Sequence, residues 1–249
     1  MSEAKLAGTR YAFLSRRRTG DTGQQASERG RLAAAVEATL RDAILNLELE
    51  PGTMLDKQVI CHNLRVSRSP VSAAMARLAE EGLVDVLPQR GTRVTLIALT
   101  DIRQQLFIRR ALESEVVASL APGVSDTVLE ALEANLVEQQ AAVDADDQQR
   151  FHLADLQFHE ILVDALELPR VKSFVASARN GLDRARRLMA SPSRIRGTLK
   201  EHARVVKALQ KRDSGSAAAA MRAHLDAVAD ELQRLAGKRP DLFADKSDG

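Results

Sequence analysis

The chain has 249 residues, of which 45% are hydrophobic and 28% charged, and its formal net charge is +2. These proportions indicate a water-soluble globular protein with room for two domains. No run of 18 apolar residues is present, which excludes a transmembrane helix. Aromatic residues make up 3% and Trp is absent, which argues against a base-stacking surface for single-stranded nucleic acid. An N-terminus without an apolar signal core and a single cysteine, Cys61, favour a cytoplasmic protein.

The N-terminal part of the chain differs from the rest in charge and periodicity. Residues 1–30 are rich in Gly, Ser, Thr, Gln and Arg without a sustained repeat, so we expect a mobile arm there. Residues 1–97 hold 14 Lys and Arg against 11 Asp and Glu. This small basic excess favours nucleic acid as a partner of the N-terminal part.

The pattern of residues 31–98 predicts three helices followed by a hairpin. Apolar residues recur with helical spacing in three stretches, and Pro51-Gly52 and Gly82 end the first and third of them. Two short β-prone runs then flank the turn Pro88–Gly91. The helices are expected at about 32–47, 56–63 and 69–81, and the strands at 83–87 and 92–97. Together these elements make a winged helix-turn-helix, a DNA-binding domain.

Several polar residues of this domain are placed to contact DNA. Ser67, Arg68 and Ser69 stand at the start of the third helix, where hydroxyls and backbone N–H groups hold phosphates and an arginine can bind guanine in bidentate fashion. The hairpin tip is placed as a wing on the minor groove or the backbone. The predicted DNA-binding residues are Gln58, Ser67, Arg68, Ser69, Ser72, Arg90 and Gly91.

From about residue 99 the pattern is helical throughout, so residues 99–238 are expected to form an all-α bundle, followed by a tail at 239–249. The fold class is therefore mainly α, with an N-terminal winged helix-turn-helix. Six helical segments are predicted between Pro, Gly, Asp and Ser breaks. They span about 100–121, 125–143, 147–166, 169–190, 194–211 and 214–236.

Four polar residues of the bundle suggest a divalent-metal site. Asp155 and His159 are four residues apart on one helix face, and His202 and His224 lie on the apolar stripes of two later helices. A buried ionisable group must be paired or neutralised, and a shared cation would meet that need. Three imidazoles and one carboxylate suit Zn²⁺, Ni²⁺ or Mn²⁺ and leave positions open for a ligand oxygen. His62 and His152 do not fit this set.

Arg109 lies on the inward stripe of the first bundle helix. Two roles are open for its guanidinium. It can pair with Glu113 one turn later, or it can bind the carboxylate of a small organic acid whose other end meets the metal.

The residues also resemble a known family. The winged-helix part is similar to that of GntR-family bacterial regulators, and the helical part resembles the FadR-type effector domain of that family, called FCD. The resemblance covers about residues 32–236 and is carried by Leu49-Glu50-Pro51-Gly52, Val66-Ser67-Arg68-Ser69-Pro70-Val71, Arg77-Leu78, Glu81-Gly82-Leu83, Arg90-Gly91 and the Asp155, His159, His202, His224 set. It implies a homodimeric repressor that binds a pseudo-palindromic operator and responds to a small carboxylate effector.

Two positions depart from the family pattern, and two other functions stay open. Ser72 stands where family members usually carry Arg, which implies a changed operator preference, and Arg65 stands where Gly is common. One alternative keeps the DNA-binding regulator but makes the metal structural, or makes the metal itself the signal. The other is a metalloenzyme, although no general base with diagnostic spacing accompanies the four ligands.

Overall fold

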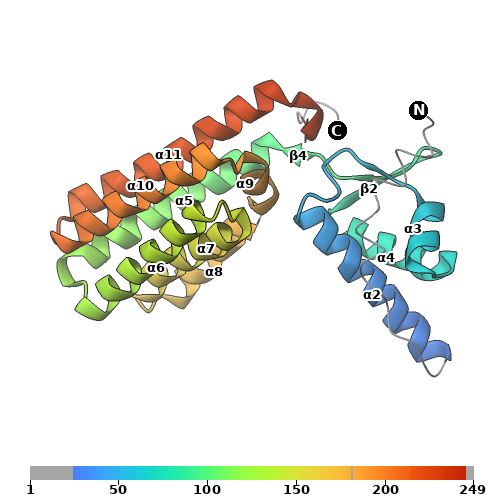
Figure 1. The fold of residues 1–249 in the computed structure, drawn as a ribbon, viewed down its shortest axis with the longest axis horizontal. Helices are drawn as coiled ribbons and strands as arrows, with labels where there is room; N and C mark the ends of the chain where they lie inside the picture. The colour runs from blue at the N-terminus through green and yellow to red at the C-terminus, as the bar shows by residue number, and fades with distance from the viewer. Residues whose placement is uncertain (1–24, 181, 245–249) are drawn as a thin grey trace. The chain divides into compact units, whose positions relative to one another are not determined.

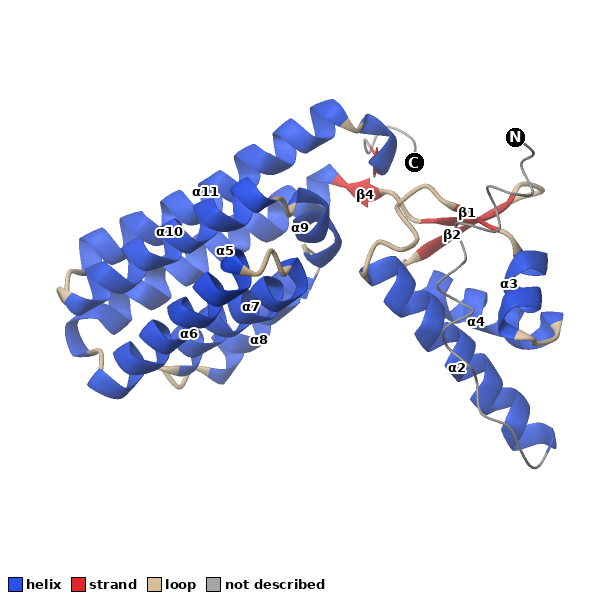
Figure 2. Ribbon diagram, in the orientation of Figure 1, coloured by secondary structure: helices blue, strands red, loops and turns tan. Residues whose placement is uncertain are grey.

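The computed structural model describes residues 25–180 and 182–244 (Figure 1). The chain forms two compact units. The described residues up to Ile97, together with Pro240–Ala244, make up the first, and the second is formed by Ala98–Arg239. Helices dominate both units, and the few strands are short (Figure 2). None of the described helices is long and apolar enough to span a membrane.

The described part of the first unit contains the α-helices α2 (Gln25–Leu45), α3 (Lys57–Leu64) and α4 (Arg68–Glu80). The helix expected from about residue 32 begins earlier, at Gln25, within the segment that we expected to be a mobile arm; residues 1–24 lie outside the described part. Residues 25–31 carry no apolar stripe, but most of them have good helix propensity and extend the amphipathic helix that follows.

Local hydrogen bonds set the ends of α3. The carboxylate of Asp56 caps its start by accepting from the backbone N–H groups of Gln58 and Val59, at 2.8 and 3.2 Å. Arg65 ends the helix in the left-handed conformation, with φ of 55°, a region that glycine adopts at much lower cost. The turn into α4 is therefore formed at an energetic cost to Arg65.

A three-stranded antiparallel sheet completes the winged helix. Its strands are β1 (Met54–Leu55), β2 (Val84–Leu87) and β3 (Gly91–Val94), in the order β1-β3-β2. The hairpin of β2 and β3 follows the sequence prediction, and Val84 pairs with Val94. β1 has only two residues, too few to be found from alternation. The core beneath the sheet consists of buried aliphatic side chains, among them Val36, Leu40, Ile44, Leu49, Ile60, Val71, Met75, Leu78 and Val94.

Residues Pro240–Ala244 belong to this first unit. The segment 239–249 was expected to be a tail, but Pro240–Leu242 forms a 3₁₀ turn and β5 (Phe243–Ala244) pairs with β4 (Ile97–Ala98). The side chains of Leu242 and Phe243 are buried. A two-residue strand of this kind has no periodicity, so its pairing depends on tertiary contacts.

The second unit is an all-α bundle, as the sequence predicted. Long helices pack side by side, α11 against α5 and α10, and α6 against α7 (Figure 1). Where one helix was expected at 169–190, two are found, one ending at Asn180 and the next beginning at Asp183. The helices are α5 (Leu99–Leu120), α6 (Asp126–Asp144), α7 (Gln148–Asp164), α8 (Pro169–Asn180), α9 (Asp183–Met189), α10 (Pro192–Gln210) and α11 (Ser214–Lys238).

Side-chain caps define where four of these helices begin. Ser125, Asp147, Ser191 and Asp213 each accept a hydrogen bond from the backbone N–H three residues later. The caps stand at four of the breaks predicted between the helical segments. The caps therefore fix the residues at which α6, α7, α10 and α11 begin.

Candidate metal centre and DNA-binding surface

Three histidines from three helices meet in the interior of the second unit. His159 on α7, His202 on α10 and His224 on α11 all have an exposed fraction of 0%. One ring nitrogen of each lies within 4.8 Å of the others. The rings of His202 and Phe158 stack with centroids 4.0 Å apart, which holds the His202 ring in place. The interior therefore contains a compact cluster of imidazole nitrogens.

In each of these rings, Nδ1 lies close to a side-chain oxygen from another helix of the unit. His202 Nδ1 lies 2.9 Å from Gln139 Oε1, and His224 Nδ1 lies 2.8 Å from Glu201 Oε2. His159 Nδ1 lies 2.5 Å from Glu113 Oε2, in a geometry outside that of a hydrogen bond. Oxygen acceptors at Nδ1 place the proton there and leave the lone pair on Nε2.

The Nε2 atoms of His202 and His224 are buried and have no hydrogen-bond partner among the described residues. Buried polar atoms are almost always satisfied, so two neighbouring exceptions call for a partner. A carboxylate or amide oxygen behind each metal-binding histidine is also the usual support of metal sites. The residues present therefore fit a divalent cation bound by the Nε2 atoms.

A relay of amides fixes the orientation of Gln139. Its Nε2 donates to Asn135 Oδ1 at 2.7 Å, and Asn135 Nδ2 donates to the backbone oxygen of Ala154 at 3.0 Å. Gln139 must therefore present its oxygen to His202. Neither amide was singled out in the sequence, although Leu132, Asn135, Gln139 and Ala142 form a buried stripe on α6 whose two polar members were a usable signal.

Asp155 lies one turn before His159 and is 1% exposed. Its Oδ1 is 3.7 Å from His202 Nε2 and has no hydrogen-bond partner among the described residues, and its Oδ2 accepts from Arg186 Nη2. Burial would raise the pKa of this carboxyl, but the Arg186 guanidinium and nearby groups hold it well below its usual range. An ionised Asp155 therefore has one oxygen available beside the histidines.

Burial also determines the charge of the imidazoles. It lowers the pKa of His159 to about 3 and lowers those of His202 and His224. Glu201 behind His224 is ionised; burial opposes this, but His224 and Arg194 lower its pKa to about 2. Neutral imidazoles are the form that binds a metal ion.

Arg109 and Glu113 are a buried pair on α5, with exposed fractions of 0% and 2%. Arg109 Nε donates to Glu113 Oε1 at 2.6 Å and Nη2 donates to Oε2 at 3.3 Å. Of the two roles left open by the sequence, the ion pair is present. Arg109 Nη1 is buried without a partner among the described residues, so one donor remains for an anion.

The other histidines lie elsewhere. His62 is exposed on α3 in the first unit. His152 is half-buried on α7, and burial, together with Arg186 and Arg187, lowers its pKa. Sequence reasoning missed Glu201, Arg179 and Arg186 as neighbours of the cluster, because their contacts depend on how the helices are packed.

The predicted DNA-binding residues are all exposed on the first unit. Ser67 stands at the N-cap of α4 without a side-chain cap hydrogen bond, so its hydroxyl is available. Within residues 25–180 and 182–244, no ion pair involves Arg68 or Arg90. Gly91 at the hairpin has φ of +101°, which favours glycine. Gln58, Ser69 and Ser72 lie on α3 and α4.

Ion pairs fasten the recognition helix α4 to α2. Glu37 accepts from Arg77 at 3.0 Å and from Arg41 at 2.6 Å, and Arg41 also pairs with Glu81. Arg77 lies in the last turn of α4 and Glu81 is its C-cap, so these contacts are at the end opposite the exposed N-terminal residues. The helix is thus held as one body with the core of the unit.

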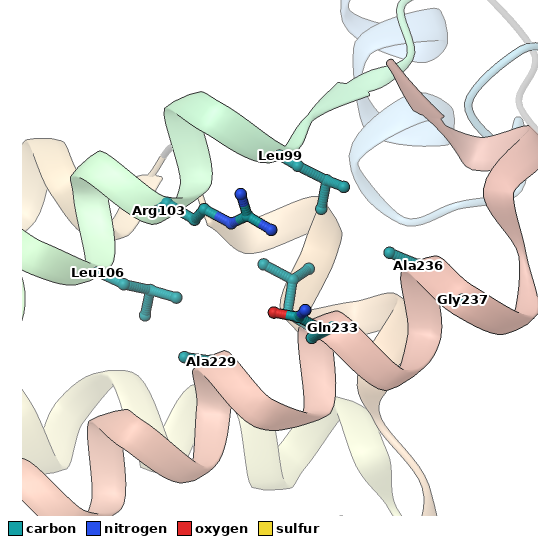
Figure 3. Close-up of a pocket in the computed structure, with 8 residues that line it drawn as sticks. Leu99, Arg103, Leu106, Ala229, Gln233, Ala236 and Gly237 are labelled. Carbon is teal, nitrogen blue, oxygen red and sulfur yellow. The ribbon is translucent and has the colours of Figure 1, made fainter. Parts of the chain in front are cut away.

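A separate groove of about 280 Å³ lies between α5 and α11 (Figure 3). Its lining is mostly apolar, and Arg103 and Gln233 supply the polar side chains. None of the predicted site residues lines it. The lining residues are Leu99, Arg103, Leu106, Ala229, Leu232, Gln233, Ala236 and Gly237.

Comparison with known proteins gives matches over most of the chain. Residues 32–94 match the family described as bacterial regulatory proteins, gntR family, and residues 104–227 match the FCD domain. The HTH-type transcriptional repressor RspR of Escherichia coli (strain K12) is 30% identical over 210 residues, which cover 83% of this chain and 91% of the relative.

Two further matches agree. An HTH-type transcriptional regulator in an unstable DNA locus of Streptomyces ambofaciens is 35% identical over 209 residues, covering 82% of this chain and 86% of the relative. The crystal structure of a GntR transcriptional regulator from Rhodococcus sp. RHA1 is 25% identical, with a TM-score of 0.63, and covers 81% of this chain and 97% of that one. These relatives are regulators, so the metalloenzyme alternative is dropped.

Proposed function

This chain belongs to the GntR family of bacterial transcriptional regulators, with a C-terminal FCD domain, and we propose that it is a repressor that contains a metal ion and responds to a small carboxylate ligand. In this proposal a homodimer binds a pseudo-palindromic operator through two winged helices. A small carboxylate that binds beside the metal changes the operator affinity. The repressor assignment rests on the similarity to the Escherichia coli relative, a transcriptional repressor.

DNA binding is assigned to the start of α4 and the hairpin tip. Exposed Ser67, Arg68 and Ser69 surround a helix N-terminus, which attracts phosphates. Arg68 is the candidate for direct base contact, and Arg90 with Gly91 for the wing. Ser72 on α4 and Gln58 on α3 are exposed and complete the proposed surface.

Metal binding is assigned to His159, His202 and His224, with Asp155 as the fourth ligand. The observation that carries it is the convergence of buried imidazoles whose Nδ1 atoms contact oxygens while the Nε2 atoms of two rings lack partners. The nitrogen and oxygen donors suit Zn²⁺, Ni²⁺ or Mn²⁺. A bound ion would act as a Lewis acid that attracts a ligand oxygen.

Effector binding is assigned to Arg109. Its Nη1 is unpaired, while Nη2 lies 3.4 Å from His159 Nε2, so the guanidinium adjoins the proposed metal. The Glu113 carboxylate fixes its orientation. A carboxylate between the metal and this arginine would receive both a coordinate bond and a charge-assisted hydrogen bond.

The metal assignment is tested by titrating the chelator-treated protein with Zn²⁺, Ni²⁺ and Mn²⁺ in a calorimeter. We expect one ion per chain and loss of binding in His202→Ala. His62→Ala, an exposed histidine of the other unit, is the control and should bind normally. Stoichiometric binding that survives His202→Ala would contradict the assignment.

Operator binding is tested by fluorescence anisotropy at several salt concentrations, with DNA from the promoter region of the gene that encodes this chain. Arg68→Ala should weaken binding and reduce the discrimination between the operator and unrelated DNA. Chelation and a panel of small acids then separate the alternatives. If chelation lowers only the melting temperature and no acid changes DNA affinity, the metal is structural.

A further inference from the structure

Three buried arginines adjoin the histidine cluster. Arg109 comes from α5, Arg179 from α8 and Arg186 from α9, and α8 packs against both α5 and α7. Arg109 is fully buried, Arg179 is 4% exposed, and the Arg186 side chain is 11% exposed. Only Arg109 was expected at this site from the sequence.

Four nitrogen atoms of these guanidinium groups lack partners. Arg109 Nη1, Arg179 Nε and Nη2, and Arg186 Nη1 are buried and make no hydrogen bond to any of the residues that the structure describes. Arg186 uses another nitrogen, Nη2, to hold Asp155. Buried guanidinium donors that are left unsatisfied are strongly unfavourable, so these four nitrogen atoms call for an anionic partner.

The charges of the cluster point the same way. Asp155, Glu113, Arg109 and Arg186 all act electrostatically on Arg179, so these five groups form one set. Among these five groups, three guanidinium groups face two carboxylates. Guanidinium groups therefore exceed carboxylates by one in this set. A divalent ion would add further positive charge.

We propose that the effector is a small dicarboxylate, one carboxylate of which meets the metal and Arg109 while the second is bound by Arg179 and Arg186. This inference rests on the proposed function of the helical unit as a metal-dependent acid sensor. A monocarboxylate would leave the donors of Arg179 and Arg186 unpaired. Planar guanidinium groups bind a carboxylate through two parallel hydrogen bonds, which gives the second group a defined position.

The test compares acids of matched length on the full chain by calorimetry, in both Zn²⁺-loaded and chelator-treated forms. The probes are malonate, succinate and glutarate against acetate, propionate and butyrate. At least one diacid should bind about tenfold or more tightly than its monoacid counterpart, since a charge-assisted hydrogen bond adds about that much.

Arg179→Gln should abolish most of this preference, because it should weaken the diacid severalfold more than the monoacid. Arg170→Gln, an exposed arginine of the same helix, is the matched control and should change neither. If Arg179→Gln does not fold, Arg179→Lys takes its place, and it should lower the preference severalfold because it cannot bind a carboxylate in bidentate fashion.

Equal affinities for diacid and monoacid would overturn the inference, and so would equal weakening of both by the Arg179 variant. Inorganic phosphate that binds as tightly as the best diacid would indicate a general dianion site and would also overturn it. Failure of the proposed function has a different result, the absence of Zn²⁺ binding. In that case the chelator-treated titrations still test the arginine set.

Discussion

The buried pair of Arg109 and Glu113 allows one stability prediction to be worked out in detail. Glu113→Gln keeps the shape of the side chain but removes its charge. The fully buried Arg109 then loses its counter-ion, and one of the two oxygens that contact Arg109 and His159 becomes an NH₂ group. Removal of one partner from a buried ion pair costs about 3–5 kcal/mol. For a unit of this size that corresponds to a fall in melting temperature of about 10 °C.

The assay is thermal unfolding of chelator-treated protein, followed by calorimetry so that the two units can be resolved. Glu115→Gln, on the exposed face of the same helix, is the control and should stay within about 0.5 kcal/mol of wild type. The double variant Arg109→Met, Glu113→Leu should recover most of the loss, because a hydrophobic pair can replace a buried ion pair. A melting temperature for Glu113→Gln within about 2 °C of wild type would refute the reasoning.

Three further predictions concern the metal centre, the dependence of stability on pH and the winged helix. Gln139→Leu should weaken Zn²⁺ binding about 10- to 100-fold, measured by competition with a chelating dye, while the exposed neighbour variant Gln140→Leu should not. The chelator-treated protein should lose stability as pH falls below 6.5, because the unfolded chain takes up a proton on His159 that the folded chain takes up only near pH 3. At pH 4.5 the protonation of this one residue should lower the free energy of unfolding by about 3 kcal/mol. Urea unfolding that shows no loss of stability between pH 7 and 4.5 would contradict this prediction. Arg65→Gly should raise the unfolding free energy of the first unit by about 0.5–1 kcal/mol, because φ is 55° at this position. A lower unfolding free energy for this variant in urea titrations would count against that explanation.

Helical periodicity was enough to predict the bundle and to predict that the four proposed metal ligands face its interior. The spacing of Asp155 and His159 places both on one face whatever the neighbours are. His202 and His224 replace apolar residues on otherwise apolar stripes, which is visible in one dimension. Their burial and mutual approach follow from the same patterns.

The supporting residues could not be predicted in the same way. Gln139 reaches His202 only because α6 and α10 pack in a particular register, and Arg186 reaches Asp155 across α9 and α7. Such contacts depend on interhelical geometry, which no local pattern contains. The two-residue strand β1 and the early start of α2 were missed because neither carries an apolar repeat.

The N-terminal caps of the helices have a consequence for how such a chain can vary. His202 and His224 each lie eleven residues after the cap of their helix, Ser191 and Asp213. Eleven residues are close to three whole turns, so both imidazoles leave their helices in nearly the same direction as the cap. Inserting or deleting one residue between cap and imidazole would rotate the ring by about 100° and move it out of the cluster. Length changes are therefore expected in the connections before the caps, while the stretch from cap to imidazole acts as a ruler of fixed length.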